Sequence, residues 1–253
     1  MGGIKPIDGG KLPNVDRLWI DANGARLCCD HRRGGDRTVV LLHEMGGSLE
    51  SYDAVVAGLG ARWSVLRYDQ RGAGRSQAPS GSLSIDMAAA DLDGLLDALS
   101  IERPVALVGT AVGAGVAIGF AARHPEKVAA LVLLAPATGL IAEHRAATIE
   151  KIEALEEDLR HGIADNAKSG RLATWRMLAD MDLDADIAAL DCPVLVAAGT
   201  DDAFRPPDHV ADVAGRIAGA RYTLLNTGHV MAIDTPDLVV ATVTGFLDEV
   251  GFR

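Results

Sequence analysis

The chain has little cysteine, and the positions of its cysteines argue against a framework of disulfide bonds. Cys28 and Cys29 are adjacent and Cys192 is the third among 253 residues. An odd count with two neighbours is atypical of a disulfide-stapled secreted domain, so we expect reduced thiols and a cytoplasmic location. The first ten residues, MGGIKPIDGG, also lack the basic patch and apolar run of a signal peptide.

An excess of positive charge and long apolar runs are also missing. The chain has 24 Lys and Arg against 35 Asp and Glu, a net charge of −11, which argues against nucleic acid or an anionic membrane as partner. No apolar stretch approaches the roughly 20 residues that span a bilayer. We therefore expect a small-molecule substrate as the partner and no cofactor or metal. A monomer and a homodimer both stay open.

Aromatic residues make up only 4% of the chain, so Val, Leu and Ala must fill the core that a hydrophobic content of 49% allows. Short apolar runs alternate with segments of helical periodicity, after a hairpin signal at Asn23-Gly24 within 17–31. Strands are predicted at 38–44, 64–70, 105–109, 128–136, 193–200 and 220–226, and helices at 49–59, 85–99, 112–123, 206–217 and from 236 onward. This alternation predicts an α/β fold with a mostly parallel sheet and helices on both faces.

Residues 138–190 interrupt the alternation, because they are charged, helical in period and without strand runs. We expect this segment to be a helical lid on a core formed by 1–137 and 191–253. Trp175, Met177 and Met181 follow near-helical spacing in it. They would either fill the core of the lid or roof an apolar pocket, and Trp175 is the substrate-binding candidate among them.

Chemically useful side chains follow the predicted strands. Because the carboxyl ends of parallel strands meet at one edge of a sheet, we expect these side chains to gather there. In chain order they are His43-Glu44-Met45-Gly46-Gly47, the stretch from Asp69 to Ser76, the tip Thr110-Ala111-Val112, the pair Asp201-Asp202, and Gly228-His229.

In combination these stretches resemble the α/β-hydrolase family. The family has D-x-R-G-x-G-x-S after its fourth strand, which Asp69–Ser76 matches. It has a nucleophile elbow G-x-S-x-G after the fifth, which 109–113 matches except at its centre. An acid motif G-x-x-D-x-x-x-P at 199–206 and a final Gly228-His229 complete the order. Within the family the chain looks most like small bacterial enol-lactonases and esterases.

The resemblance implies an α/β-hydrolase fold and a set of roles. His229 would be the proton acceptor and Asp202, rather than its neighbour Asp201, would orient it. The backbone amides of Met45 and Val112 would form an oxyanion hole.

Other positions are expected to be structural. His43 would brace its loop, and Thr110 would point away from the reacting centre. The turn residues Asp69, Arg71, Gly72 and Gly74 would tie loops together, with the glycines at positive φ.

Two positions depart from the family pattern. Ala111 stands where the family has its serine nucleophile, and Glu44 stands where it usually has a glycine beside the oxyanion hole. The chain could be a serine hydrolase with an introduced alanine. It could instead be an enzyme that uses a His–Asp dyad without covalent attack, on an ester or lactone or as a cofactor-free dioxygenase or lyase. A ligand-binding protein without turnover is the third interpretation. We rank an enzyme first, because a binder has no need of an oriented acid and base.

Overall fold

The structure, a computed structural model, describes residues 17–161 and 166–253. The expectation that the first ten residues hold no signal peptide therefore concerns a part of the chain outside the described residues. The strands are β1 (Leu18–Ala22), β2 (Ala25–Arg32), β3 (Thr38–Leu42), β4 (Ser64–Tyr68), β5 (Val105–Thr110), β6 (Val128–Leu134), β7 (Val194–Gly199) and β8 (Arg221–Leu225). The α-helices are α1 (Asp53–Leu59), α2 (Ile85–Ala98), α3 (Val112–Arg123), α4 (Arg145–Arg160), α5 (Asn166–Asp180), α6 (Asp184–Ala188), α7 (Pro207–Gly215), α8 (Met231–Asp234) and α9 (Pro236–Glu249). Short 3₁₀ helices are η1 (Leu49–Tyr52), η2 (Pro125–Lys127) and η3 (Ala142–His144).

The strands form one sheet in the order β1-β2-β4-β3-β5-β6-β7-β8. β1 and β2 form the predicted hairpin, with Asn23 and Gly24 both at positive φ, and β2 pairs antiparallel with β4. All other pairs are parallel. The predicted α/β fold with a mostly parallel sheet is confirmed, and the predicted strand boundaries differ from the observed ones by a few residues at most.

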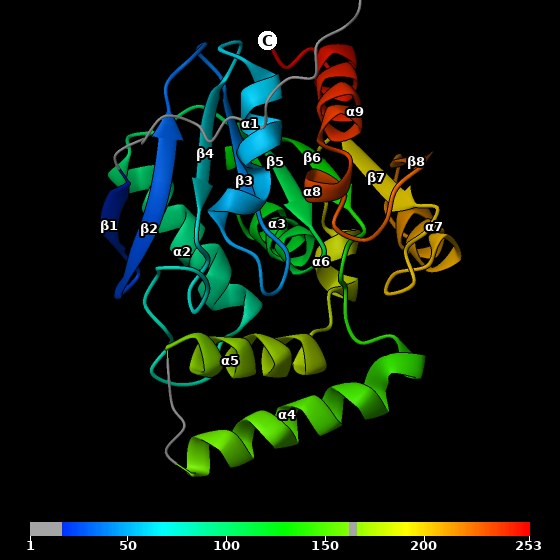
Figure 1. Cartoon of the computed structure of the whole chain (residues 1–253). Helices are drawn as coiled ribbons and strands as arrows, with labels where there is room; N and C mark the ends of the chain where they lie inside the picture. Colours follow the sequence, from blue (N-terminus) through cyan, green and yellow to red (C-terminus); the bar gives the residue numbers. More distant parts are fainter. Residues whose placement is uncertain (1–16, 162–165) are drawn as a thin grey trace, which may run out of the picture.

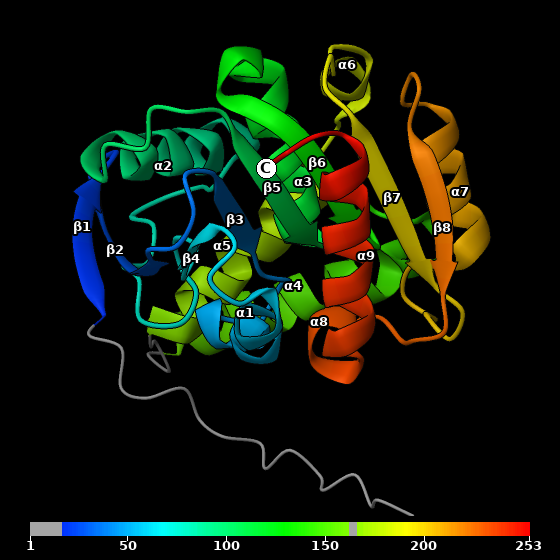
Figure 2. The ribbon, with the colours of Figure 1, turned by 90° about the horizontal axis from the view of Figure 1, so that it is seen from above.

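Helices cover both faces of the sheet. Figure 2, seen from above, shows one group of helices on each side of the strands. α2, α3, α6 and α7 pack into one hydrophobic layer, and α1, α8 and α9 pack into the other. The central strands are buried on both faces, and every residue of β3, β5 and β7 is buried. This double cover explains why these strands read as continuous apolar runs rather than as an alternating pattern.

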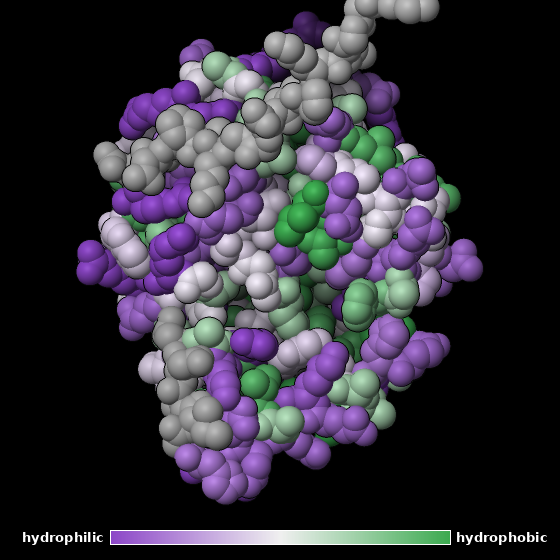
Figure 3. Space-filling model, in the orientation of Figure 1, coloured by the Kyte–Doolittle hydropathy of each residue, from purple (hydrophilic) through white to green (hydrophobic). Residues whose placement is uncertain are grey.

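α4 and α5 form a separate layer beyond the carboxyl ends of the strands, at the bottom of Figure 1. α5 turns Leu172, Ala173, Met177 and Leu178 inward, whereas Thr148 is the buried residue of α4. In Figure 3 the exposed surface of this layer is mainly hydrophilic. The described residues of 138–190 contain helices and no strand, and α6 packs on α3 in the core. Whether the α4–α5 layer acts as a lid stays a prediction.

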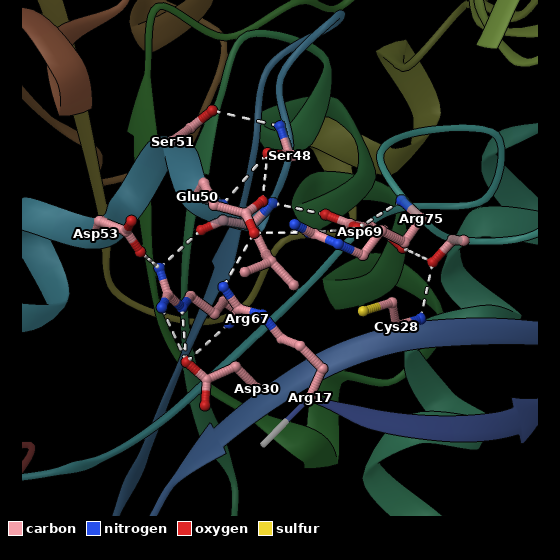
Figure 4. Close-up of polar contacts among 12 residues, drawn as sticks. Arg17, Cys28, Asp30, Ser48, Glu50, Ser51, Asp53, Arg67, Asp69 and Arg75 are labelled. Carbon is pink, nitrogen blue, oxygen red and sulfur yellow. Dashed lines mark hydrogen bonds and ion pairs between the residues drawn. The ribbon is translucent and has the colours of Figure 1, made fainter. Parts of the chain in front are cut away.

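A buried ionic network fixes the loops on the β2–β4 side of the sheet (Figure 4). Arg67 is 1% exposed, and its Nε donates to Asp30 Oδ2 at 2.9 Å while its guanidinium also pairs with Asp53. Asp69 accepts from the backbone N–H of Leu49 through Oδ1 and of Arg75 through Oδ2, both at 2.8 Å. One carboxylate thus ties η1 to the loop after β4, which agrees with the structural role expected of that turn.

Along the part of the chain that the structure describes, we find no helix that combines the length and the apolar character required to cross a membrane.

Candidate active site

The turn between β5 and α3 keeps the geometry of a nucleophile elbow although its tip is alanine. Ala111 has φ 50° and ψ −112°. This backbone conformation costs a non-glycine residue about 1–3 kcal/mol, so the surroundings must hold it. They do so through the amide of Ala111, which donates to Leu134 O at 2.9 Å, and through its carbonyl, which accepts from Ala137 N at 3.0 Å.

Gly113 allows the elbow to approach β3 closely. A Cβ atom at this position would lie 2.2 Å from the carbonyl oxygen of Leu42 and 2.6 Å from that of His43. Any side chain would therefore push α3 away from the loop after β3. The glycine keeps the first residue of α3, Val112, next to Met45.

The amides of Met45 and Val112 are available to a ligand. Among the hydrogen bonds of the described residues, neither amide donates to a protein acceptor. Both residues line the same cavity as Ala111. An oxyanion hole requires two unbonded N–H groups that point at one oxygen, so these two amides are candidates for that role.

His229 and Asp202 are brought together from the ends of β8 and β7. His229 Nδ1 lies 2.7 Å from Asp202 Oδ2, and the Asp202 side chain is fully buried while that of His229 is 21% exposed. Asp202 Oδ1 accepts from the amides of Phe204 and Arg205 at 2.8 Å each, so the carboxylate is fixed. The neighbouring Asp201 is exposed.

The other ring nitrogen of His229 faces a different environment. Nε2 makes no hydrogen bond to the described residues, and His229 lines the cavity with Ala111. The exposed ring of Phe204 lies beside the imidazole, with 5.3 Å between ring centroids. Asp202 therefore favours the tautomer with a proton on Nδ1, which leaves Nε2 as a proton acceptor toward the cavity.

Glu44 lies at the base of the cavity, directly before Met45. Its Oε1 accepts from Ser51 Oγ at 2.8 Å, whereas its Oε2 is buried and has no partner among the described residues. Gly47 makes room for this carboxyl group, because a Cβ atom at 47 would lie 2.1 Å from Glu44 Oε1. An unpartnered buried oxygen costs free energy, so a donor from a ligand or a water would satisfy it.

His43 braces the loop as expected. Its Nε2 accepts from the amide of Gln70 at 3.1 Å, so its Nδ1 carries the proton and donates to the carbonyl of Glu44 at 2.7 Å. Burial lowers the pKa of His43 against the opposing effect of the Glu44 carbonyl, so the ring stays neutral. Thr110 Oγ1 bonds the hydroxyl of Tyr52 at 2.7 Å and thus points away from His229.

The cavity has a volume of about 600 Å³ and lies between the strand ends and the α4–α5 layer. Its base holds Glu44, Met45, Ala111, Val112 and His229. Its roof includes Trp175, which is half-buried, whereas Met177 is buried in the core and Met181 packs against it. Of the three residues that the sequence left open between pocket roof and core, Trp175 alone lines this cavity.

Three cationic cavity residues were not identified from the sequence. Lys151, Arg171 and Arg205 line the cavity from α4, α5 and the loop after β7. Arg205 lies within the acid motif, three residues after Asp202, and could have been considered from that position. Nothing in the spacing of Lys151 and Arg171 distinguishes them from other charged residues on α4 and α5. Among the described residues, no group of three or more His, Cys, Asp or Glu side chains is placed to hold a metal ion.

Comparisons with known proteins agree with the fold. A family model described as the alpha/beta hydrolase fold matches residues 37–153. The chain is 30% identical to a putative carbamate hydrolase RutD of Pantoea ananatis over 79% of its length and 84% of that protein. It is 26% identical to a pyrrolizixenacetamide deacetylase of Xenorhabdus hominickii, covering 92% of this chain and 98% of the other. The crystal structure of the enol-lactonase of Burkholderia xenovorans LB400 superposes with a TM-score of 0.79 at 26% identity, over 91% of this chain and 100% of that one.

The chain therefore belongs to the α/β-hydrolase fold family. The relatives named as hydrolases support a hydrolase that acts on a small substrate.

Proposed function

We propose that this protein hydrolyses a small carbonyl substrate, an ester or a lactone, with water as the nucleophile. His229 is the general base, Asp202 orients it, and the amides of Met45 and Val112 bind the developing oxyanion. The observation that supports this most directly is the His229–Asp202 bond of 2.7 Å at a cavity that also holds two amides without protein acceptors.

In the proposed reaction Nε2 of His229 takes a proton from water as the water oxygen bonds to the carbonyl carbon. The carbonyl electron pair moves to its oxygen, which accepts from both amides. When the intermediate collapses, the bond to the leaving group breaks, and the proton on His229 passes to that leaving oxygen. The Ala111 methyl group forms no covalent intermediate. We propose that α4 and α5 act as a lid that limits the entry of bulk water.

A second candidate is proton abstraction from an acidic C–H or O–H group of the substrate, the chemistry of the dyad-dependent dioxygenases and lyases on this fold. The methyl group of Ala111 favours it over acyl transfer, because no serine hydroxyl competes for Nε2. The native codon at position 111 tests whether the alanine was introduced into a serine hydrolase, since a serine codon in the gene would establish it.

The test compares the protein with its His229→Ala and Asp202→Asn variants on p-nitrophenyl acetate and on simple lactones. We expect His229→Ala to lower the rate by at least about a hundred-fold, the usual size of a general-base contribution. Thermal midpoints should stay unchanged, and mass spectrometry should find no acyl-enzyme. Full activity in His229→Ala would exclude this residue as the base. An active protein that turns over no ester or lactone but deprotonates a ketone in a His229-dependent way would favour the second candidate.

A further inference from the structure

Of the 22 Lys and Arg side chains among the described residues, thirteen pair with a carboxylate of those residues. Examples are Arg62 with Asp248, Arg123 with Asp186, Lys127 with Asp93 and Arg176 with Glu156. A net charge of −11 makes carboxylate partners abundant. Unpaired cations also occur outside the cavity, so a set of them is informative only where its members share one cavity.

Three cations that line the cavity differ from this pattern. Within 17–161 and 166–253, no carboxylate oxygen lies within 4.0 Å of the charged nitrogens of Lys151, Arg171 or Arg205. They come from α4, α5 and the loop after β7, and all three line the one cavity of about 600 Å³. Segments that are distant in sequence thus bring three unneutralised charges to one space.

Arg205 is the buried member of this set. It is 7% exposed, and its Nη1 donates to Gly139 O at 3.0 Å. A guanidinium has five N–H donors, so most of its capacity is unused by the described residues. Burial lowers the pKa of Arg205, while nearby Asp202 acts in the opposite direction. A buried cation of this kind is stabilised when an anion binds to it.

Lys151 and Arg171 are exposed while they line the cavity, so they lie at its open side. Nζ of Lys151 lies 5.0 Å from the ring centre of Trp175, which holds the ammonium group against the roof. Glu44, from the loop after β3, lines the same cavity beside Met45. The cavity therefore has an acidic base and a cationic roof.

We propose that Lys151 and Arg171 form a subsite for a carboxylate group on the α4–α5 side of the cavity, with Arg205 adding positive charge from the loop after β7, so that the substrates are carbonyl compounds that also carry a carboxylate. This inference rests on the proposed function for the position of the carbonyl at the amides of Met45 and Val112. Lys151 and Arg171 lie on α4 and α5, so a carboxylate that they bind is directed toward that layer. The charge pattern thus selects both the substrate class and its orientation.

The test measures binding rather than turnover, so that it does not depend on the chemistry. Monomethyl succinate, glutarate and adipate are titrated calorimetrically into the protein, each beside its neutral dimethyl ester. The variants are the double change Lys151→Gln with Arg171→Gln, and Arg176→Gln as the matched control. Arg176 lies on the same helix as Arg171, pairs with Glu156 and does not line the cavity.

We expect at least one monoester to bind about ten-fold or more tightly than its diester, the effect of a charge-assisted hydrogen bond. The double variant should lose most of this preference, Arg176→Gln should keep it, and added salt should reduce it. Equal affinity for monoesters and diesters, no binding of any monoester, or an unchanged preference in the double variant would overturn the inference.

The two proposals fail in different ways. If the proposed hydrolysis is wrong, the monoesters still bind preferentially but no methanol is released, and His229→Ala changes nothing. If the carboxylate subsite is wrong, His229-dependent turnover persists without discrimination between monoester and diester.

Discussion

The base and the roof of the cavity are built in different ways. The base is made by strand ends and tight turns, and its groups are held by backbone hydrogen bonds and buried carboxylates, as at Ala111 and Asp202. The roof is made by α4 and α5, where exposed side chains such as Lys151 and Arg171 face the same space. The base thus depends on fixed geometry and the roof on side-chain chemistry. We expect changes at the base to affect folding and catalysis, and changes at the roof to affect which substrate binds.

The largest effect is expected when a bulkier residue is introduced at the base of the cavity. In Gly113→Ala the new Cβ atom would meet the Leu42 carbonyl oxygen at 2.2 Å, which is backbone and cannot rotate away. We expect a loss of about 2–4 kcal/mol in the free energy of unfolding, measured by urea denaturation.

Gly245→Ala is the matched control, because Gly245 is exposed in α9 and a Cβ atom there would meet nothing within 4 Å. It should be neutral or stabilise the protein by up to about 1 kcal/mol. Equal stability of Gly113→Ala and the native protein would show that the base is more tolerant than its geometry indicates.

The second effect is a pH dependence of stability that originates in a buried histidine of the loop after β3, at the base of the cavity. Burial lowers the pKa of His43 below its unfolded value of about 6.5. The unfolded chain therefore binds more protons below about pH 6.5, and stability falls as the pH drops through that value toward the folded pKa. The slope contributed by one such group is up to about 1.4 kcal/mol per pH unit.

The measurement is the urea midpoint between about pH 5 and pH 8. His43→Gln removes the titrating group, so this variant should have lower stability at neutral pH but a flatter dependence on pH. A variant with the same slope as the native protein would assign the effect to other groups, such as His31 and His209, whose pKa values burial also lowers.

A roof change should act on binding instead. Trp175→Ala removes an aromatic wall of the cavity and the surface against which Lys151 rests. We expect KM to rise by about ten-fold with little change in kcat, because a roof residue contributes binding energy to substrate and transition state alike. Arg176→Ala, at the next position of α5, should leave both constants unchanged. A large fall in kcat with constant KM would place Trp175 in the reacting region.

The smallest effect on the natural reaction is expected at the elbow tip. Ala111→Ser adds a hydroxyl that can bond His229 and compete for its basic nitrogen, so turnover of the natural substrate should stay within about ten-fold of native or fall. A gain of orders of magnitude on both the natural substrate and a model ester, with an acyl-enzyme detected by mass spectrometry, would contradict this. The site would then be that of a serine hydrolase without its serine.

Much of the base of the cavity could be predicted from the sequence, because its residues follow directly after the strands. The apolar runs predicted the parallel strands, and each strand end delivers its next few residues to one edge of the sheet. That rule brings His229 and Asp202 to one edge of the sheet, whereas Met45 and Val112 were named from the resemblance to the family. The 3₁₀ start of the predicted helix at 49–59, and the short helix α8 after His229, were not predicted, because such short elements carry too little periodicity.

The sequence by itself determined the α/β fold, the order of its elements and the absence of a hydroxyl at position 111, since these depend on local pattern and residue identity. Only the tertiary structure decided that Glu44 keeps a buried oxygen without a partner in the described part of the chain, and that Trp175 rather than Met177 lines the cavity. It also decided that Lys151, Arg171 and Arg205 line one cavity, with no ion pair to a carboxylate of the described residues. Charge pairing across the fold depends on which side chains converge from distant segments, and no spacing along the chain encodes that convergence.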